Sequence, residues 1–357
     1  MIYRMPAGLN LSKPKSRCPK CLTPIRMRHN IPVFGWLMLR GKCFDCKAPI
    51  SFRYPLIEAT VGGLFVLLLL WEFASGGANL PNHTEPPISG LIRLVSSRHS
   101  GTLFSWYGWH VTLLTLLLAM AMMQFDRERI PVRLLMFTLI PALIVTAFLP
   151  KLYLVPHQIP GIPFADASVP GASGSFSFSL SGPITGLTGL LSGFLVGGFF
   201  GLIAKSVTSP STNGTQSVRN LAFMGAVIGF FLGWQAICCL VLMTLLATLI
   251  LLICNRSQLL QLAGITLFLS SLLFILWWRD FQHLLEMAIP LGERLTGILL
   301  PLTILLISTF VLTLWVKKCP SNETLIAAAP DQEESSEPAS EQGFKPDLPL
   351  PNQSGES

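Results

Sequence analysis

The chain has 357 residues, of which 51% are hydrophobic and only 12% are charged. That charged fraction is about half the soluble average, which excludes an ordinary soluble globular protein. The net charge of +7 could indicate a nucleic-acid-binding protein, but Lys and Arg placed on one side of a membrane explain it without nucleic acid.

Residues 1–55 contain two CxxC pairs, Cys18–Cys21 and Cys43–Cys46, separated by 21 residues. Two such turns brought together place four thiolates around one tetrahedral zinc ion, and a site closed in this way leaves no position open for catalysis. A redox-active CxxC is the alternative, although redox pairs are not normally duplicated at this spacing. The pattern therefore predicts a small zinc-ribbon-like four-cysteine domain, in which the metal supplies much of the folding energy.

Apolar runs follow, each long enough to cross a bilayer. The predicted spans are 57–73, 105–125, 134–149, 183–204, 221–236, 237–253, 260–278 and 296–316. The stretch 221–253 is too long for one ordinary span, so we expect a break at Gly233-Trp234-Gln235, with one long tilted helix as the alternative. The predicted fold class is an all-α polytopic membrane bundle of about eight transmembrane helices.

The distribution of Lys and Arg predicts the orientation of this bundle. Residues 1–55 hold eleven Lys or Arg against one acid, Asp45. An even number of spans from a cytoplasmic N-terminus also places the other basic loops inside, and the long segments 74–104 and 150–182 outside. The four-cysteine domain and the C-terminal tail are then both cytoplasmic.

Small and aromatic residues add two structural expectations. Glycine recurs at every fourth position in two predicted helices, which lets helix backbones approach closely. These ladders are Gly189, Gly193, Gly197, Gly201 and Gly225, Gly229, Gly233. Trp106, Tyr107 and Trp109 are expected to form an interfacial belt where the second span begins. The cysteines Cys238, Cys239, Cys254 and Cys319 are expected to act as small hydrophobic side chains.

The predicted domains are 1–55 (four-cysteine domain), 56–318 (membrane bundle) and 319–357 (tail). Residues 320–357 hold eight acids, one Lys and six prolines, a composition typical of a disordered segment.

The segment "SRCPKCLTPIRMRHNIPVFGWLMLRGKCFDCKAPISFRYPLIE" resembles the cytoplasmic cysteine domain of bacterial type IV prepilin peptidases. "IGFFLGWQAI" is similar, more weakly, to a small-residue helix of the same family. The resemblance implies an inner-membrane aspartic endopeptidase that cuts the leader from prepilins and pseudopilins and N-methylates the product with S-adenosylmethionine. The match at Glu58 implies an anchoring or packing role for that side chain.

The family has a membrane span ahead of the cysteine segment, ending in V-I-x-R-x-P, and this chain opens within that motif, "IYRMP". The favoured interpretation is that the start codon has been placed too far downstream. The other interpretation is that the protein lacks the first helix of the family.

The resemblance also locates two catalytic aspartates. The first stands seven residues before the proline of an I-P pair, which corresponds to Gln124 ahead of Ile130-Pro131. The second belongs to a G-x-G-D motif and falls near Leu221, within a stretch, 205–253, that contains no Asp or Glu. An aspartic peptidase needs two carboxylates that share a proton, so both expected catalytic positions are replaced.

Asp126 is the remaining candidate for a catalytic carboxylate, and the sequence offers no partner for it. Glu128 shares its loop, but the cations there would hold both carboxylates ionised. The favoured reading of Asp126 is a hydrated helix end, charge-paired through its neighbours Arg127 and Arg129.

Two hypotheses follow from these residues. The first is a working prepilin peptidase that uses Asp126 or substitutes. The second, favoured by the missing aspartates, is a pseudoenzyme that binds prepilin-like leaders, or a pilus or type II secretion assembly partner, without cutting them. Methylation without proteolysis is a third, and the sequence shows no nucleotide-binding loop in its support.

Overall fold

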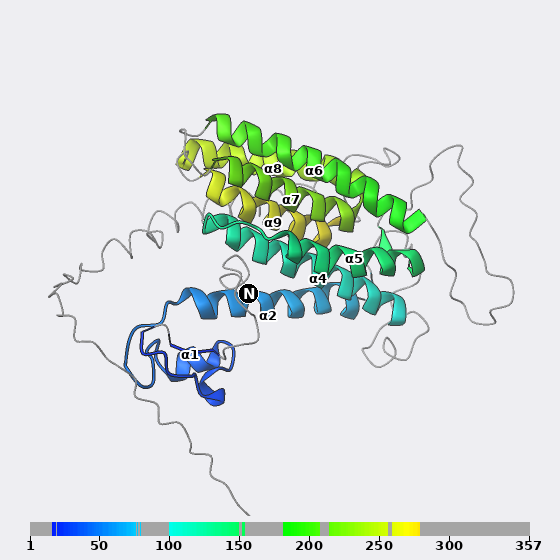
Figure 1. Ribbon diagram of the computed structural model, residues 1–357. Coiled ribbons are helices and arrows are strands. Elements are labelled where there is room, and N and C mark those ends of the chain that lie inside the picture. Colours follow the sequence, from blue (N-terminus) through cyan, green and yellow to red (C-terminus); the bar gives the residue numbers. More distant parts are fainter. Residues whose placement is uncertain are drawn as a thin grey trace, which may run out of the picture. The chain divides into compact units, whose positions relative to one another are not determined.

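The computed structural model describes residues 16–18, 20–75, 77, 79, 100–149, 152–153, 181–207, 214–255 and 259–278. These residues are almost entirely helical and contain no named strand. The helices, shown in Figure 1, are η1 (Met27–His29), α1 (Phe34–Met38), α2 (Arg53–Leu68), the π-helix η2 (Leu69–Ala74), α4 (Ser100–Phe125), α5 (Val132–Phe148), α6 (Ser181–Val207), α7 (Gly214–Leu232), α8 (Trp234–Asn255) and α9 (Leu259–Leu276).

Each predicted span from 57–73 to 260–278 coincides with a helix, while 296–316 and the tail lie outside the described residues. Four helical stretches in the described part are long and apolar enough to cross a membrane: Arg53–Glu72, Leu103–Phe125, Gly182–Ser206 and Leu259–Leu276. The apolar stretches Val132–Phe148 and Cys239–Leu251 are shorter. A helical membrane protein is therefore supported, and the count of about eight spans stays a prediction.

The predicted break near Gly233 is present. Helix α7 ends at Leu232 and α8 begins at Trp234, because Gly233 adopts a φ of 86°, a backbone conformation that side chains other than glycine rarely adopt. The chain therefore continues as two separate helices and not as one tilted helix.

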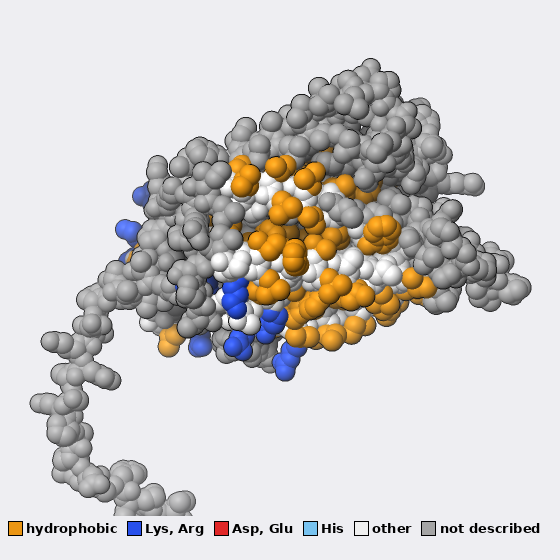
Figure 2. Space-filling view, turned by 90° about the horizontal axis from the view of Figure 1, so that it is seen from above, with side chains coloured by type: hydrophobic (Ala, Val, Ile, Leu, Met, Phe, Trp, Pro, Cys, Tyr) orange, Lys and Arg blue, Asp and Glu red, His pale blue; other side chains and the backbone are white. Residues whose placement is uncertain are grey.

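Helices α4, α7 and α9 form the centre of the bundle. Of the spans of α4 and α9, 72% and 83% are buried, against 17% for α2 and 28% for α6. The outer helices leave large apolar side chains exposed, and Figure 2 shows a broad hydrophobic face with Lys and Arg gathered at one end. Lipid tails can cover such a face without cost, since they are as apolar as the side chains.

The aromatic residues at the start of α4 behave differently from the prediction. Trp106 and Trp109 are buried, at 7% and 6% exposure, and the indole N–H of Trp109 donates to the carbonyl of Phe231 at 2.9 Å. The interfacial belt is therefore wrong for these two residues. Trp109 can pack inside the protein because a buried indole needs a hydrogen-bond acceptor, and α7 supplies one.

The two glycine ladders face each other across α6 and α7. A Cβ added to Gly193 would meet the carbonyl oxygen of Gly225, and one added to Gly229 would meet that of Gly189. The backbones of the two helices are thus in direct contact, as the spacing predicted. Gly198 follows Gly197 of the α6 ladder and lies outside the ladder. A Cβ added to Gly198 would be 3.6 Å from the Ala222 side chain, an ordinary contact distance.

Replacing Gly193 by Ala should lower the free energy of unfolding by about 1–3 kcal/mol, because the methyl group must push two backbones apart. Gly198→Ala is the matched control and should be neutral or stabilising, since alanine favours a helix and the space is open. Thermal unfolding of both variants in detergent micelles measures the difference. Equal unfolding temperatures would show that α6 and α7 are not in backbone contact.

Candidate functional site

The two CxxC pairs lie in turns of the same backbone form. The N–H of the first cysteine donates to the carbonyl five residues on, at 3.0 Å for Cys18 and 2.8 Å for Cys43. The residue after each second cysteine has a positive φ, 57° at Leu22 and 59° at Lys47. This repeated turn directs both thiols of a pair to one side, as the sequence spacing predicted.

The four cysteine sulfurs form one cluster. All lie within 4.8 Å of one another, with 3.8 Å between Cys18 and Cys46 and 4.0 Å between Cys21 and Cys43. Four thiolates around a tetrahedral zinc ion would stand about 3.8 Å apart, given a zinc–sulfur distance of about 2.3 Å. The cluster therefore fits a metal ion. The paired strands of a zinc ribbon are not confirmed, because the described residues around the cluster form only isolated bridges.

The local hydrogen bonds prepare some of these thiols for metal binding. Hydrogen bonds from Thr23 lower the pKa of Cys21 to about 6, and the backbone N–H of Cys46 lowers that of Cys43. The N–H of Ala48 favours the Cys46 thiolate, but burial and the neighbouring sulfurs together raise the pKa of Cys46 to about 11. A bound metal cation would lower the pKa of Cys46 again, since a thiol that coordinates a metal is deprotonated.

Gln124, the residue at the expected first aspartate position, is buried and fully hydrogen-bonded. Its Nε2 donates to the carbonyl of Leu260 in α9 at 2.7 Å, and its Oε1 accepts a hydrogen bond from Nδ2 of Asn220 at 2.9 Å. Gln124 and Asn220 are each 1% exposed. The site thus holds two neutral amides in contact between α4 and α7.

Asn220 also fixes the loop that follows α4. Its Nδ2 donates to the carbonyl of Glu128 at 2.8 Å, and its Oδ1 accepts from the N–H of Ile130 at 3.2 Å. Gln216, one turn earlier in α7, donates to the carbonyl of Arg127 at 2.6 Å. The amide pair is therefore part of a hydrogen-bond network that joins two helices and a loop.

Asn220 is the residue that the sequence reasoning missed. It precedes Leu221, where the second aspartate position was placed, and Leu221 itself is fully buried in the hydrophobic core. The available signal was an amide next to the expected aspartate position, in a stretch without acids. Its partner could not be read from the sequence, because the contact depends on the register of α7 against α4.

Asp126 is paired with a residue far away in sequence. Its two carboxylate oxygens accept hydrogen bonds from the guanidinium of Arg53, at 2.5 and 2.6 Å. Both side chains are about one quarter exposed, at 26% for Arg53 and 24% for Asp126. The predicted charge pairing of this helix end is present, but its partner is Arg53 at the start of α2.

A second ionisable pair is buried inside the bundle. Nδ1 of His110 lies 2.5 Å from Oε1 of Glu72, and both residues are 1% exposed. Glu72 belongs to the π-helix η2, which continues α2, and His110 belongs to α4. This pair therefore lies at the far end of α2 from the Arg53–Asp126 pair. Helix α2, which buries little apolar surface, is thus held to α4 by polar contacts near both of its ends.

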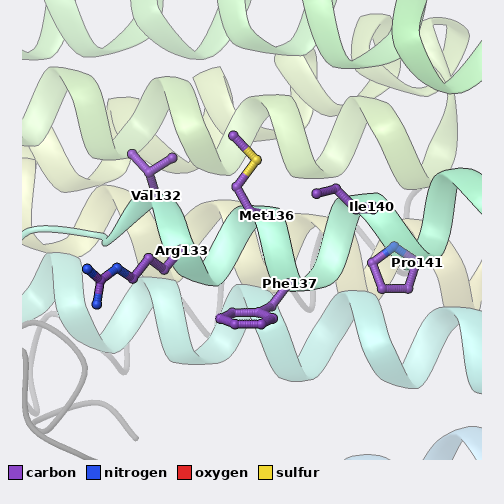
Figure 3. Close-up of a pocket in the computed structure, with 6 residues that line it drawn as sticks. All are labelled: Val132, Arg133, Met136, Phe137, Ile140 and Pro141. Carbon is purple, nitrogen blue, oxygen red and sulfur yellow. The ribbon is translucent and has the colours of Figure 1, made fainter.

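A groove of about 640 Å³ runs along the outer face of α5. Figure 3 shows the residues that line it, which are Val132, Arg133, Met136, Phe137, Ile140 and Pro141. Apart from Arg133 these side chains are apolar, and they include none of the candidate site residues. The groove has the character of a lipid-facing surface and not of a catalytic cleft.

Taken together, these features define a helical protein with candidate membrane spans and a four-cysteine cluster whose geometry could hold a metal ion. Residues 1–73 match the family described as the bacterial peptidase A24 N-terminal domain. These residues contain the four-cysteine cluster, and the match assigns that domain description to this segment of the chain alone.

Curated relatives agree with this assignment. The chain is 55% identical over 64 residues to a prepilin leader peptidase/N-methyltransferase of Neisseria gonorrhoeae, which covers 18% of this chain and 22% of the relative. It is 37% identical over 143 residues to a protein of the same name from Stutzerimonas stutzeri, which covers 40% of this chain and 39% of the relative. The chain thus spans well under half the length of these relatives. No solved structure matches it.

Replacing Cys21 or Cys43 by Ser should remove most of the bound zinc, because three thiolates hold the ion far less tightly than four. Metal analysis of the purified protein measures the zinc content per chain. Cys239→Ser, which alters a cysteine outside the cluster, is the control and should keep one zinc. Unchanged zinc in the Cys21 and Cys43 variants would exclude this cluster as the metal site.

Replacing Asn220 by Leu should destabilise the protein by about 2–4 kcal/mol, because it leaves polar groups of the buried residues Gln124 and Ile130, and the carbonyl of Glu128, without their partner. Ser192→Ala is a suitable control, since the Ser192 hydroxyl donates only to a carbonyl of its own helix. Its effect should stay within about 0.5 kcal/mol. Chemical unfolding in mixed micelles gives both values, and similar stabilities would contradict the network.

Proposed function

We propose that this chain is a membrane-embedded prepilin-peptidase-like protein that binds prepilin or pseudopilin leader segments without hydrolysing them. The observation that carries the proposal is the Gln124–Asn220 amide pair, which occupies the region where the family resemblance expects two aspartates. Hydrolysis by an aspartic peptidase needs one carboxylate to take a proton from water while the other donates one. Amides can do neither at physiological pH.

The hydrogen bonds of the pair support this reading. The oxygen of Gln124 and the oxygen of Asn220 each accept a bond from the protein, and their nitrogens donate to protein groups. The pair is buried, with both residues 1% exposed. A catalytic dyad must present free oxygens to a water molecule, and this arrangement instead serves as a structural connection between helices.

Asp126 does not replace the missing dyad. Both of its oxygens accept hydrogen bonds from Arg53, so neither is directed at a second carboxylate. The pairing argues against the alternative of a working peptidase built on Asp126.

The remaining parts of the proposal follow the family. Zinc is the metal that best fits four clustered thiols, with a structural role. The relatives are named prepilin leader peptidase/N-methyltransferase, so the expected partners are prepilin leaders and the expected location is the bacterial inner membrane. The four-cysteine domain and the C-terminal tail would face the cytoplasm. S-adenosylmethionine is implied as a cofactor by the resemblance alone.

A cleavage assay tests the central claim. The full chain, in lipid vesicles and with zinc bound, should leave a prepilin intact over a time in which the Stutzerimonas stutzeri relative cuts it completely. Mass spectrometry of the prepilin N-terminus reports leader removal. Photo-crosslinking of a labelled leader peptide to the chain should still succeed, because binding does not require the aspartates.

Two outcomes would overturn the proposal. Leader removal that is lost in Asp126→Asn would assign catalysis to Asp126 after all. Absence of both cleavage and crosslinking would show that the chain does not recognise leaders.

A further inference from the structure

Helix α1 turns its large apolar side chains away from the four-cysteine domain. Phe34, Leu37 and Met38 are 65%, 55% and 61% exposed. The other two residues of this short helix face inward: Gly35 is buried, and Trp36 donates its indole N–H to a backbone carbonyl of the domain at 3.0 Å. The inner face of α1 thus packs on the rest of the four-cysteine domain, and the outer face of α1 is uncovered.

Two further side chains just before α1 extend the uncovered surface. Met27 is 91% exposed and Ile31 is 48% exposed. We call Met27, Ile31, Phe34, Leu37 and Met38 together the α1 patch. Several exposed large apolar side chains close together in the sequence of a small domain indicate an interaction surface, because water contact with so much apolar area is unfavourable.

The α1 patch begins beside the membrane helix α2. The backbone N–H of Val33, the residue before α1, donates to Oε2 of Glu58 at 2.8 Å. Glu58 lies five residues after Arg53, where α2 and its candidate span begin, which is about 8 Å along a helix. Helix α1 therefore starts close to the level at which α2 would enter the bilayer.

The charges around the patch are positive. Arg28 lies between Met27 and Ile31 in sequence, and Arg40 follows Met38; both are exposed, and the described residues form no ion pair with either. Asp45, the acid among residues 1–55, is 3.7 Å from Arg26. An apolar surface bordered by cations fits an anionic lipid surface, since the side chains enter the interface while the cations meet the headgroups.

We propose that the α1 patch is an interfacial anchor that docks the four-cysteine domain onto an anionic bilayer surface beside α2. A basic leader peptide would be repelled by the same cations, and so would the equally basic domain of a second copy. The inference goes beyond leader binding and requires only that α2 spans the membrane.

The test compares two lipid surfaces. The full chain, with zinc bound, is placed in nanodiscs of phosphatidylglycerol or of phosphatidylcholine, and trypsin cleavage after Arg40 is followed by mass spectrometry. Cleavage should be roughly tenfold slower in phosphatidylglycerol, because Arg28 and Arg40 reach the anionic headgroups only when the apolar side chains have entered the interface. Substitution of Phe34, Leu37 and Met38 by Ser should abolish the difference between the lipids.

Leu22→Ser is the matched control, since Leu22 is also apolar and 60% exposed but lies in the first cysteine turn. It should keep the tenfold difference, and a zinc content of one per chain confirms that each variant is folded. Equal cleavage in both lipids would overturn the anchor. So would a lipid difference that survives the three Ser substitutions, which would mean that charge alone holds the domain.

Discussion

The structure depends on one constraint: inside a bilayer, polar groups have no water and must find partners within the protein. Helix α4 shows how the constraint is met. Its polar side chains His110 and Gln124 reach partners on the π-helix after α2 and on α7 and α9. Asp126, directly after α4, pairs with the first residue of α2. These contacts make α4 the element around which the described helices are arranged.

Backbone contact between α6 and α7 complements those polar links. Apolar side chains gain little from packing on one another in lipid, so close approach of small residues is the main source of helix association there. The glycines of α6 and α7 provide that approach, whereas α2 buries little of its surface and is joined to α4 by the Arg53–Asp126 ion pair and, through η2, by the Glu72–His110 contact. The bundle therefore combines two kinds of association in different places.

Features that depend on neighbouring residues could be predicted from the sequence. The cysteine turns and the break at Gly233 are set by residues a few positions apart, and glycine spacing alone indicates a tight helix face. The Asp126–Arg53 and Gln124–Asn220 contacts join residues that are distant in the chain. They depend on which helices become neighbours and in what register, and periodicity does not contain that information. The position of Trp109 was misread for the same reason, since its acceptor lies on α7.

The amide pair also bears on how such a chain can change over evolutionary time. A buried carboxylate dyad is a source of strain, because one acid must stay protonated and both must remain partly unsatisfied to act on water. Amides at the same place satisfy each other and carry no charge. Loss of a catalytic pair can thus be retained because it stabilises the fold, even without selection for a new role. If the proposed function holds, the Gln124–Asn220 contact is an example of such an exchange.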